Sequence, residues 1–347
     1  MADSIFLDTI NGTECSRPPV WFMRQAGRVL PAYNKLRKKY SFKELLTDPS
    51  LAAEVTLMPV HDLGVDAAIL FSDILVIPEA MGMNLEFTDR GPVFEKALKD
   101  MSSENISAIR PDMGSLEYIY RNISKIVSQK PDNIPLIGFC GSPLTTMCYM
   151  IQGISSNHAF PDAVKFIYRY PDITHKLVNM IADISVEYAN NQIDNGVQAF
   201  QLFETHAGLL PADLYEKMII PAVKKISSTV RAKNIPLIFY PKGIGTGIKL
   251  IDHTIADVIS LDWQQSLFTA REFVGQQIVL QGNLDPRLLT LDRKAIENHL
   301  NTYLDFGKNE KKWIFSLGHG LTPDIPFENA RFVADWVRNT NWKRKRS

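Results

Sequence analysis

The sequence predicts a (β/α)8 TIM barrel, an α/β fold in which eight parallel strands are each followed by a helix, and three observations lead to this prediction. Short apolar runs rich in β-branched and aromatic residues recur along the chain, each followed by a turn and a longer amphipathic segment. The runs are apolar on both faces, which is typical of buried parallel strands. There are eight, the number that closes this barrel. They are 19–25, 67–73, 134–140, 197–204, 235–241, 256–263, 277–283 and 313–319.

The segments between the runs support the same scheme. The longest of them, ITHKLVNMIADISVEYANNQIDNG, has helical periodicity and closes with Asn-Gly, a frequent helix stop. The main alternative is a doubly wound sheet, which usually has about five to seven strands and a glycine-rich first turn. Neither GxGxxG nor GxxxxGK[ST] follows any run, so the sequence favours the barrel.

Composition narrows the class of protein. The formal net charge is zero, which argues against a broadly basic surface for nucleic acid, and no apolar stretch is long enough to cross a membrane. The N-terminal MADSIFLDTINGTE carries acidic residues where a secretion signal carries basic ones. The three cysteines fit neither a disulfide framework nor a CxxC or HxC metal pair. We therefore expect a cytoplasmic, metal-free protein.

The chain is expected to form one barrel domain over residues 1–347, with a short basic tail at about 340–347. The tail, WKRKRS, is the one basic run in the sequence. A solvated terminus explains it more simply than nuclear targeting or RNA contact.

The barrel predicts where chemistry takes place, because active sites in this fold collect at the C-terminal ends of the strands. Polar residues stand at or just after these ends in all eight runs. They are Arg24, Arg28, Asp73, Ser142, Tyr149, Glu204, Thr205, His206, Lys242, Asp262, Asn283, Asp285 and His319.

Arg24 and Arg28 are four residues apart, a spacing that places both side chains on one side of an extended or a helical segment. Two surface arginines usually pair with carboxylates. Here, however, Gly27 permits an unusual backbone and a close ligand approach, and a guanidinium binds carboxylate or phosphate through two parallel hydrogen bonds. The pair predicts an anionic ligand.

The other rim residues have both functional and structural interpretations. Asp73 could hold a cationic or N–H-rich centre, or cap the following helix. Tyr149 could donate to a carboxylate, or only pack on its neighbours. His319 lies in GHG, whose glycines would bring the backbone close to a ligand, but it could also be an ordinary buried histidine.

Two further pairs complete the rim. Of Thr205 and His206 we expect one to be structural. Lys242 and Asp262 are expected to pair with each other across the barrel mouth. No Ser-His-Asp order, HExxH pair or catalytic cysteine setting is present, which disfavours covalent and metal-dependent mechanisms.

Six motifs in order along the chain resemble the uroporphyrinogen decarboxylase family of the haem pathway. They are PPVWFMRQAGRVLPAY, DAAILFSDILVIPEAMGM, IGFCGSPLTTMCYMIQG, FQLFETHAGLL, LQGNLDP and LGHGLTPD. The resemblance implies a (β/α)8 barrel, usually a homodimer, that decarboxylates the four acetate side chains of uroporphyrinogen III to give coproporphyrinogen III and four CO2. It implies no metal, flavin or other cofactor, while composition, as above, argues against a nucleic-acid or a membrane partner.

The resemblance also implies site residues. The family's substrate-binding loop falls on Arg24, Gln25, Ala26, Gly27 and Arg28, and its central aspartate falls on Asp73. The family's catalytic residues would be Asp73, Arg24, Arg28, Tyr149 and His319. Further substrate contacts would come from Phe203, which would pack on the macrocycle, from Thr205, and from Phe42 in a mobile flanking loop. Leu144 departs from the tryptophan that the family commonly has in GSPWTL.

Two rival functions have different sequence requirements. Methyltransferases of the same superfamily generally carry an HxC pair and a later cysteine for zinc, and this chain lacks that pair. A non-catalytic tetrapyrrole carrier would need the two arginines but not Asp73.

Overall fold

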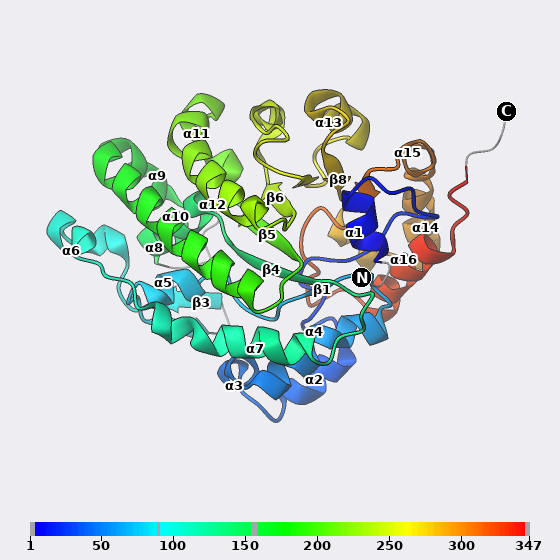
Figure 1. The fold of residues 1–347 in the computed structure, drawn as a ribbon, viewed down its shortest axis with the longest axis horizontal. Coiled ribbons are helices and arrows are strands. Elements are labelled where there is room, and N and C mark those ends of the chain that lie inside the picture. The colour runs from blue at the N-terminus through cyan, green and yellow to red at the C-terminus, as the bar shows by residue number, and fades with distance from the viewer. Residues whose placement is uncertain (1–3, 89–90, 154–158, 344–347) are drawn as a thin grey trace.

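The computed structural model describes residues 4–88, 91–153 and 159–343, and in these ranges helices surround a curled parallel sheet of seven strands (Figure 1). The strand order is β1-β4-β5-β6-β7-β8-β9. The predicted α/β barrel class is confirmed. The sheet is built from β1 (Ala68–Ile69), β4 (Leu136–Gly141), β5 (Ala199–Glu204), β6 (Leu237–Pro241), β7 (Val258–Ser260), β8 (Val279–Gln281) and β9 (Trp313–Ile314).

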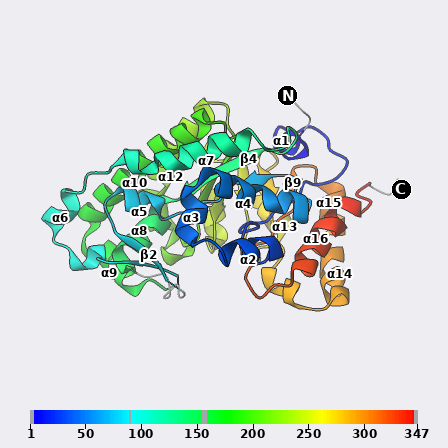
Figure 2. The ribbon, with the colours of Figure 1, turned by 90° about the horizontal axis from the view of Figure 1, so that it is seen from below.

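The helices cover the outside of the sheet and extend the molecule, with α6 and α9 at one end and α14 and α16 at the other (Figure 2). Their bounds are α1 (Ile5–Ile10), α2 (Pro31–Arg37), α3 (Phe42–Thr47), α4 (Pro49–Asp62), α5 (Val76–Ala80), α6 (Ser103–Ser107), α7 (Glu117–Val127), α8 (Pro143–Gln152), α9 (Pro161–Arg169), α10 (Pro171–Asp194), α11 (Ala212–Met218), α12 (Ile220–Ala232), α13 (Leu267–Val274), α14 (Arg293–Asn301), α15 (Leu304–Asn309) and α16 (Phe327–Asn339). The helix predicted before Asn-Gly is α10, which starts with Pro171 and ends before Gly196 at φ 109°. None of the described helices has the length and apolar character that a bilayer crossing requires.

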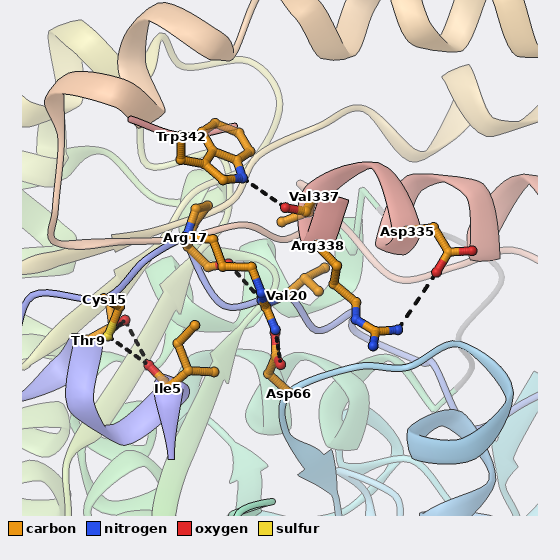
Figure 3. Close-up of polar contacts among 11 residues, drawn as sticks. Ile5, Thr9, Cys15, Arg17, Val20, Asp66, Asp335, Val337, Arg338 and Trp342 are labelled. Atoms are coloured by element: carbon orange, nitrogen blue, oxygen red, sulfur yellow. Dashed lines mark hydrogen bonds and ion pairs between the residues drawn. The ribbon is translucent and has the colours of Figure 1, made fainter. Parts of the chain in front are cut away.

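The first predicted strand, 19–25, is not one of the seven strands of the sheet, but it closes the ring through a single bridge. Val20 pairs in parallel with Phe315, beyond the end of β9, and its carbonyl accepts the Asp66 N–H at 2.8 Å on the other side. Arg17 fixes this junction from outside the sheet, because its guanidinium binds both oxygens of Asp66, at 2.7 and 2.8 Å (Figure 3). The first and last strands therefore meet at a seam defined by Val20 and Phe315.

The prediction of a strand over the whole of 19–25 is wrong beyond Trp21. The Gln25 side chain accepts the Phe22 N–H at 3.0 Å and donates to the Ala67 carbonyl at 2.9 Å. These bonds replace the strand ladder with a turn, in which the Gln25 N–H donates to the Phe22 carbonyl at 3.1 Å. The chain therefore turns away from the sheet at the point where Arg24 follows.

Two other segments depart from the simple scheme. The connection from β1 to β4 contains an antiparallel hairpin of β2 (Leu85–Thr88) and β3 (Gly91–Phe94), which the sequence did not predict. The solvated tail was predicted to start at about residue 340, and this start is too early. Trp342 is buried, and its Nε1–H donates to the Val337 carbonyl at 2.8 Å (Figure 3). Residues 344–347, which carry the rest of the basic run, lie outside the described residues.

The barrel interior contains a small polar network as well as apolar side chains. Trp21 donates through Nε1 to Gln281 Oε1 at 2.9 Å, and Gln281 Nε2 donates to the Ser260 hydroxyl at 2.9 Å. All three side chains are buried. Satisfied buried groups of this kind fix the relative positions of the strands that carry them.

Candidate active site

A cavity opens at the C-terminal ends of the strands, where the fold predicts the site. Arg24, Asp73, Thr205 and His319, four residues that the sequence placed at the rim, line it together. These four residues follow or end different predicted strands, from the first strand of the barrel (Arg24) to the last (His319). The full lining is Met23, Arg24, Ala26, Ile69, Leu70, Phe71, Ser72, Asp73, Ile74, Phe139, Phe203, Thr205, Tyr240, His319 and Gly320.

Arg24 has an unusual backbone, with φ at 58°, in the left-handed region that few residues other than glycine adopt. Its side chain lies against Gly320, where a Cβ would come within 2.5 Å of the Arg24 Cδ. The Leu321 N–H donates to the Met23 carbonyl at 2.9 Å and ties the two loops together. The strained backbone and the glycine contact thus set the direction of this guanidinium.

Asp73 lies deep in the cavity. Its Oδ1 accepts the Leu75 N–H at 2.8 Å, a local turn that comes before α5. The side chain keeps some accessible surface toward the cavity, but the dense protein around it raises the pKa of its carboxyl above the usual range. The Leu75 N–H and the Arg24 charge oppose this shift only in part. The α5 helix-capping alternative is excluded, because the N-cap of α5 is Leu75.

His319 presents its ring to the cavity with a defined hydrogen-bonding pattern. Its Nδ1 accepts the Gly320 N–H at 2.6 Å, so in the neutral ring the proton is on Nε2. The glycines of GHG were expected to bring the backbone close to a ligand. Both glycines also have a packing reason, because a Cβ on Gly318 would come within 2.4 Å of the Trp263 backbone nitrogen, and Gly320, which lines the cavity, makes room for Arg24.

Aromatic rings form the apolar wall of the cavity. Phe139 and Phe203 meet edge to face at 5.5 Å between centroids, Phe203 and Tyr240 at 6.2 Å, and Tyr240 and His319 at 6.3 Å. The Tyr240 hydroxyl donates to the Gly318 carbonyl at 2.6 Å, which turns its polar end away from the wall. A flat, apolar ligand body fits such a wall, while Arg24 and Asp73 supply charge beside it.

Tyr149 is the single member of α8 that is not buried. It does not line the cavity, but it lies near enough for the charges of Arg24 and Asp73 to act on its phenol. Burial raises the pKa of Tyr149 to about 12, so it is neutral near pH 7. Leu144, on the same helix, is fully buried and does not line the cavity either.

Four other predicted substrate-binding residues also lie outside the lining. Gln25 is fully buried and bonded to backbone at both ends of its amide, and Gly27 is not in the left-handed region, since that role falls to Arg24. Arg28 is exposed. Phe42 is the first residue of α3 rather than part of a loop, and its ring packs edge to face on the cavity-lining Phe71 at 5.6 Å.

The two arginines are available for a ligand. Within the part of the chain that the structure describes, neither Arg24 nor Arg28 forms an ion pair with a carboxylate. This observation disfavours the explanation of the pair as ordinary surface arginines. The described residues also hold no group of three or more His, Cys, Asp or Glu side chains placed to bind a metal.

The expected pairing of Lys242 with Asp262 is wrong. Asp262 accepts the N–H groups of Gly243 at 2.7 Å and Gln264 at 2.8 Å. The Lys242 ammonium instead lies 5.6 Å from the Trp263 ring centroid. Backbone donors compete successfully for this carboxylate because they are fixed in place.

Several residues of the site were missed. Phe71, Phe139 and Tyr240 each stand within or at the end of a predicted strand, but only polar residues were considered there. Of Thr205 and His206, the first lines the cavity and the second is buried behind it. His206 nevertheless approaches the site, because its Nε2 lies 3.4 Å from the Tyr149 hydroxyl.

Comparison with known proteins adds sequence relatives to this geometry. The family model described as "Uroporphyrinogen decarboxylase (URO-D)" matches residues 1–340. A relative named uroporphyrinogen decarboxylase from Pelobacter propionicus is 41% identical over 96% of this chain and 97% of its own length. One of the same name from Geobacter sulfurreducens is 39% identical over 97% of this chain and 99% of its own.

Solved structures give the fold. A methyltransferase from Methanosarcina mazei aligns with a TM-score of 0.75 over 97% of this chain and 98% of its own, at 17% identity. A B12-independent methionine synthase from Shewanella sp. W3-18-1 aligns with a TM-score of 0.54 at 14% identity. Likeness at this level of identity concerns the architecture alone.

Proposed function

The chain belongs to the uroporphyrinogen decarboxylase family, and we propose that it removes the carboxyl groups from the four acetate side chains of uroporphyrinogen III. The products are coproporphyrinogen III and four CO2, and the enzyme is a carboxy-lyase of tetrapyrrole biosynthesis. One observation supports this most strongly: Arg24 and Asp73 line the same cavity as a wall of aromatic rings.

The chemistry of the substrate matches this cavity. A porphyrinogen with eight carboxylates is anionic at its edge and presents four pyrrole N–H groups at its centre. Arginine binds carboxylate through paired hydrogen bonds, and a carboxylate accepts hydrogen bonds from N–H groups. We assign the substrate's carboxylates to Arg24 and Arg28, its N–H groups to Asp73, and its ring faces to Phe203.

Decarboxylation needs a place for the electron pair that CO2 leaves behind. Protonation of the pyrrole α-carbon next to the acetate makes an iminium-like cation, and breaking the carbon–carboxylate bond sends its electron pair into that cation. A proton then adds to the former acetate carbon, which becomes a methyl group, and the α-carbon loses its proton. The substrate thus serves as its own electron sink, and the negative charge of Asp73 stabilises the cation.

The remaining residues divide into hydrogen-bond donors and positioning groups. His319 lines the cavity, and because its Nδ1 accepts the Gly320 N–H, we assign the Nε2–H of the neutral ring as a hydrogen-bond donor to the substrate. Burial raises the pKa of Tyr149 to about 12, so its phenol is neutral near pH 7 and serves as a hydrogen-bond donor to a carboxylate. Thr205 and Ala26 contact the substrate from the lining. Gln25 and Gly27 shape the loop that carries Arg24, and Phe42 packs behind the lining residue Phe71.

We also propose that the enzyme acts as a homodimer in the cytoplasm. The support for this is the sequence resemblance to the family. Sedimentation velocity of the purified protein tests the dimer.

The decisive experiment is anaerobic incubation of the purified protein with uroporphyrinogen III, followed by separation of the products by their number of carboxylates. Products with seven to four carboxylates, together with released CO2, are expected. Binding of the porphyrinogen without CO2 release would instead identify a carrier, and the absence of both would overturn the proposal.

A further inference from the structure

A carboxylate that the proposed chemistry does not use is buried directly behind the cavity. At the end of β5, side chains alternate in direction, so Phe203 and Thr205 line the cavity while Glu204 points into the interior. Glu204 is fully buried. Its Oε1 accepts the Thr145 N–H at 2.8 Å and also the Thr145 hydroxyl.

Glu204 thereby holds the start of α8. Thr145 lies in the first turn of this helix, where unpaired N–H groups favour a negative charge. Nine of the ten residues of α8 are buried, and Tyr149 is the exception. The orientation of α8 therefore sets the position of one functional side chain, the phenol of Tyr149.

A second connection leads from Glu204 to the same phenol. The Thr145 hydroxyl, which donates to Glu204, accepts the His206 N–H at 3.2 Å. The His206 imidazole then places its Nε2 3.4 Å from the Tyr149 hydroxyl. Phe160 packs on both rings, at 4.5 Å from that of His206 and 5.1 Å from that of Tyr149, and keeps them together.

Among the residues that the structure describes, Glu204 forms no ion pair with a lysine or an arginine. The charge of Glu204 acts on three nearby titratable groups, Cys140 on β4, Cys148 on α8 and Tyr215 on α11; burial raises the pKa of each, so all three are neutral near pH 7. Burial also raises the pKa of Glu204 to about 7, against the opposing effect of Ser142, Thr145 and the Leu144 N–H. Within the described residues, Oε2 makes no hydrogen bond of regular geometry. A buried carboxylate is costly, and a purely structural cap does not require one.

We propose that Glu204 is a positioning residue for the decarboxylation. Its ionised carboxylate fixes Thr145, Thr145 fixes the backbone of His206, and His206 orients the phenol of Tyr149 toward the carboxylates of the substrate. Glu204 itself does not touch the substrate. The inference rests on the proposed function, in which Tyr149 donates to a substrate carboxylate.

The test is a double-mutant cycle of Glu204→Gln and Tyr149→Phe, with kcat and KM measured anaerobically on uroporphyrinogen III. Glutamine keeps an acceptor for Thr145 but carries no charge. At pH 8, Glu204→Gln should lower kcat about tenfold with KM unchanged within twofold, and should have no further effect in the Tyr149→Phe background. The ratio of wild-type to Glu204→Gln kcat should fall toward one at pH 6, where Glu204 is largely protonated in the wild type.

A second variant, Thr145→Val, tests the same connection if Glu204→Gln does not fold. Thr145→Val removes only the hydroxyl between Glu204 and His206, and it should show the same loss of kcat and the same dependence on Tyr149. Thr174→Val is its matched control, because Thr174 is also fully buried but its hydroxyl donates only to Tyr170 of its own helix region, at 2.8 Å. The control should keep normal kcat.

The outcomes separate the two proposals. If Glu204→Gln and Tyr149→Phe each lower kcat and their effects multiply, Glu204 does not act through Tyr149 and the inference is overturned, while the decarboxylase function stands. A lower melting temperature with unchanged kcat in either variant overturns it too. Absence of CO2 release by the wild type overturns the proposed function and, with it, this inference.

Discussion

The side chain of Arg24 rests on Gly320, and a methyl group on that glycine would lie 2.5 Å from the Arg24 Cδ and 2.7 Å from its Cγ. The second glycine of GHG thus makes room for the side chain of an arginine that follows the first strand segment. Two motifs at opposite ends of the sequence form a single structural unit.

Gly320→Ala should therefore impair substrate binding without much effect on folding. The guanidinium can move aside, but it leaves its position at the cavity, and we expect kcat/KM to fall on the order of tenfold to a hundredfold. Steady-state kinetics with thermal melting measures both effects.

Gly307→Ala is the matched control, because its Cβ would meet the rings of Trp342 and Trp313 at 2.4 and 2.5 Å, and neither tryptophan lines the cavity. It should lower the melting temperature and leave KM unchanged; the same result for Gly320→Ala would contradict the prediction.

Asp73→Asn should abolish most turnover. The substitution keeps the shape of the side chain but removes the negative charge that stabilises the cationic intermediate, so kcat should fall on the order of 100-fold or more. Anaerobic product analysis measures this, and near-normal turnover would refute the assigned role of Asp73. Near-ultraviolet circular dichroism checks that the fold is retained.

The same variant should be more stable than the wild type at neutral pH. The native pKa of Asp73 is raised above its ordinary value of 3.8, so the native state binds this proton more tightly than the unfolded chain does. The free energy of unfolding therefore falls as pH rises through this interval, and the cost is complete above the native pKa. An asparagine side chain carries no charge and is not destabilised in this way. The melting temperature of Asp73→Asn at pH 7 should therefore be higher than that of the wild type by roughly 1–4 °C. The difference should vanish below about pH 4. A less stable variant at pH 7 would mean that attraction to Arg24 outweighs burial.

Arg28→Ala should raise KM and leave stability unchanged. Arg28 is exposed and has no ion pair in the described structure, so losing a charge-assisted bond to a substrate carboxylate should raise KM roughly tenfold to a hundredfold. Arg17→Ala is the opposite case, because Arg17 binds Asp66 at the seam, at 2.7 and 2.8 Å. Its melting temperature should fall by several degrees with KM unchanged. If Arg28→Ala lowered the melting temperature and not KM, the arginine would be structural.

Periodicity and strand ends were enough to predict the barrel class and the edge at which the site forms. They were enough because buried parallel strands have a distinctive apolar pattern, and because the fold itself places loops at one edge. The turn at Arg24 could not be predicted in this way. It depends on the hydrogen bond from Gln25 to Ala67, a contact between distant parts of the chain that no local pattern reveals.

Other misses had a local signal. Ser41 and Glu44 form a capping box, and the S-x-x-E pattern that encodes it indicates a helix at Phe42 rather than a loop. Alternation along VQAFQLFET, residues 197–205, places Phe203 and Thr205 on the opposite side from Glu204, which would have separated the lining from the buried carboxylate. The error at Lys242 and Asp262 had no such signal, since the competing donors are backbone N–H groups of folded loops.

The seam between Val20 and Phe315 also bears on how the enzyme is made. Arg24 follows one side of the seam and His319 follows the other, so the cavity has no complete lining until the last strand docks beside the first. During synthesis, the N-terminal segment leaves the ribosome long before its partner exists. A growing chain therefore carries Arg24 before the segment with His319 exists, and the lining of the cavity is completed only after that later segment has been made.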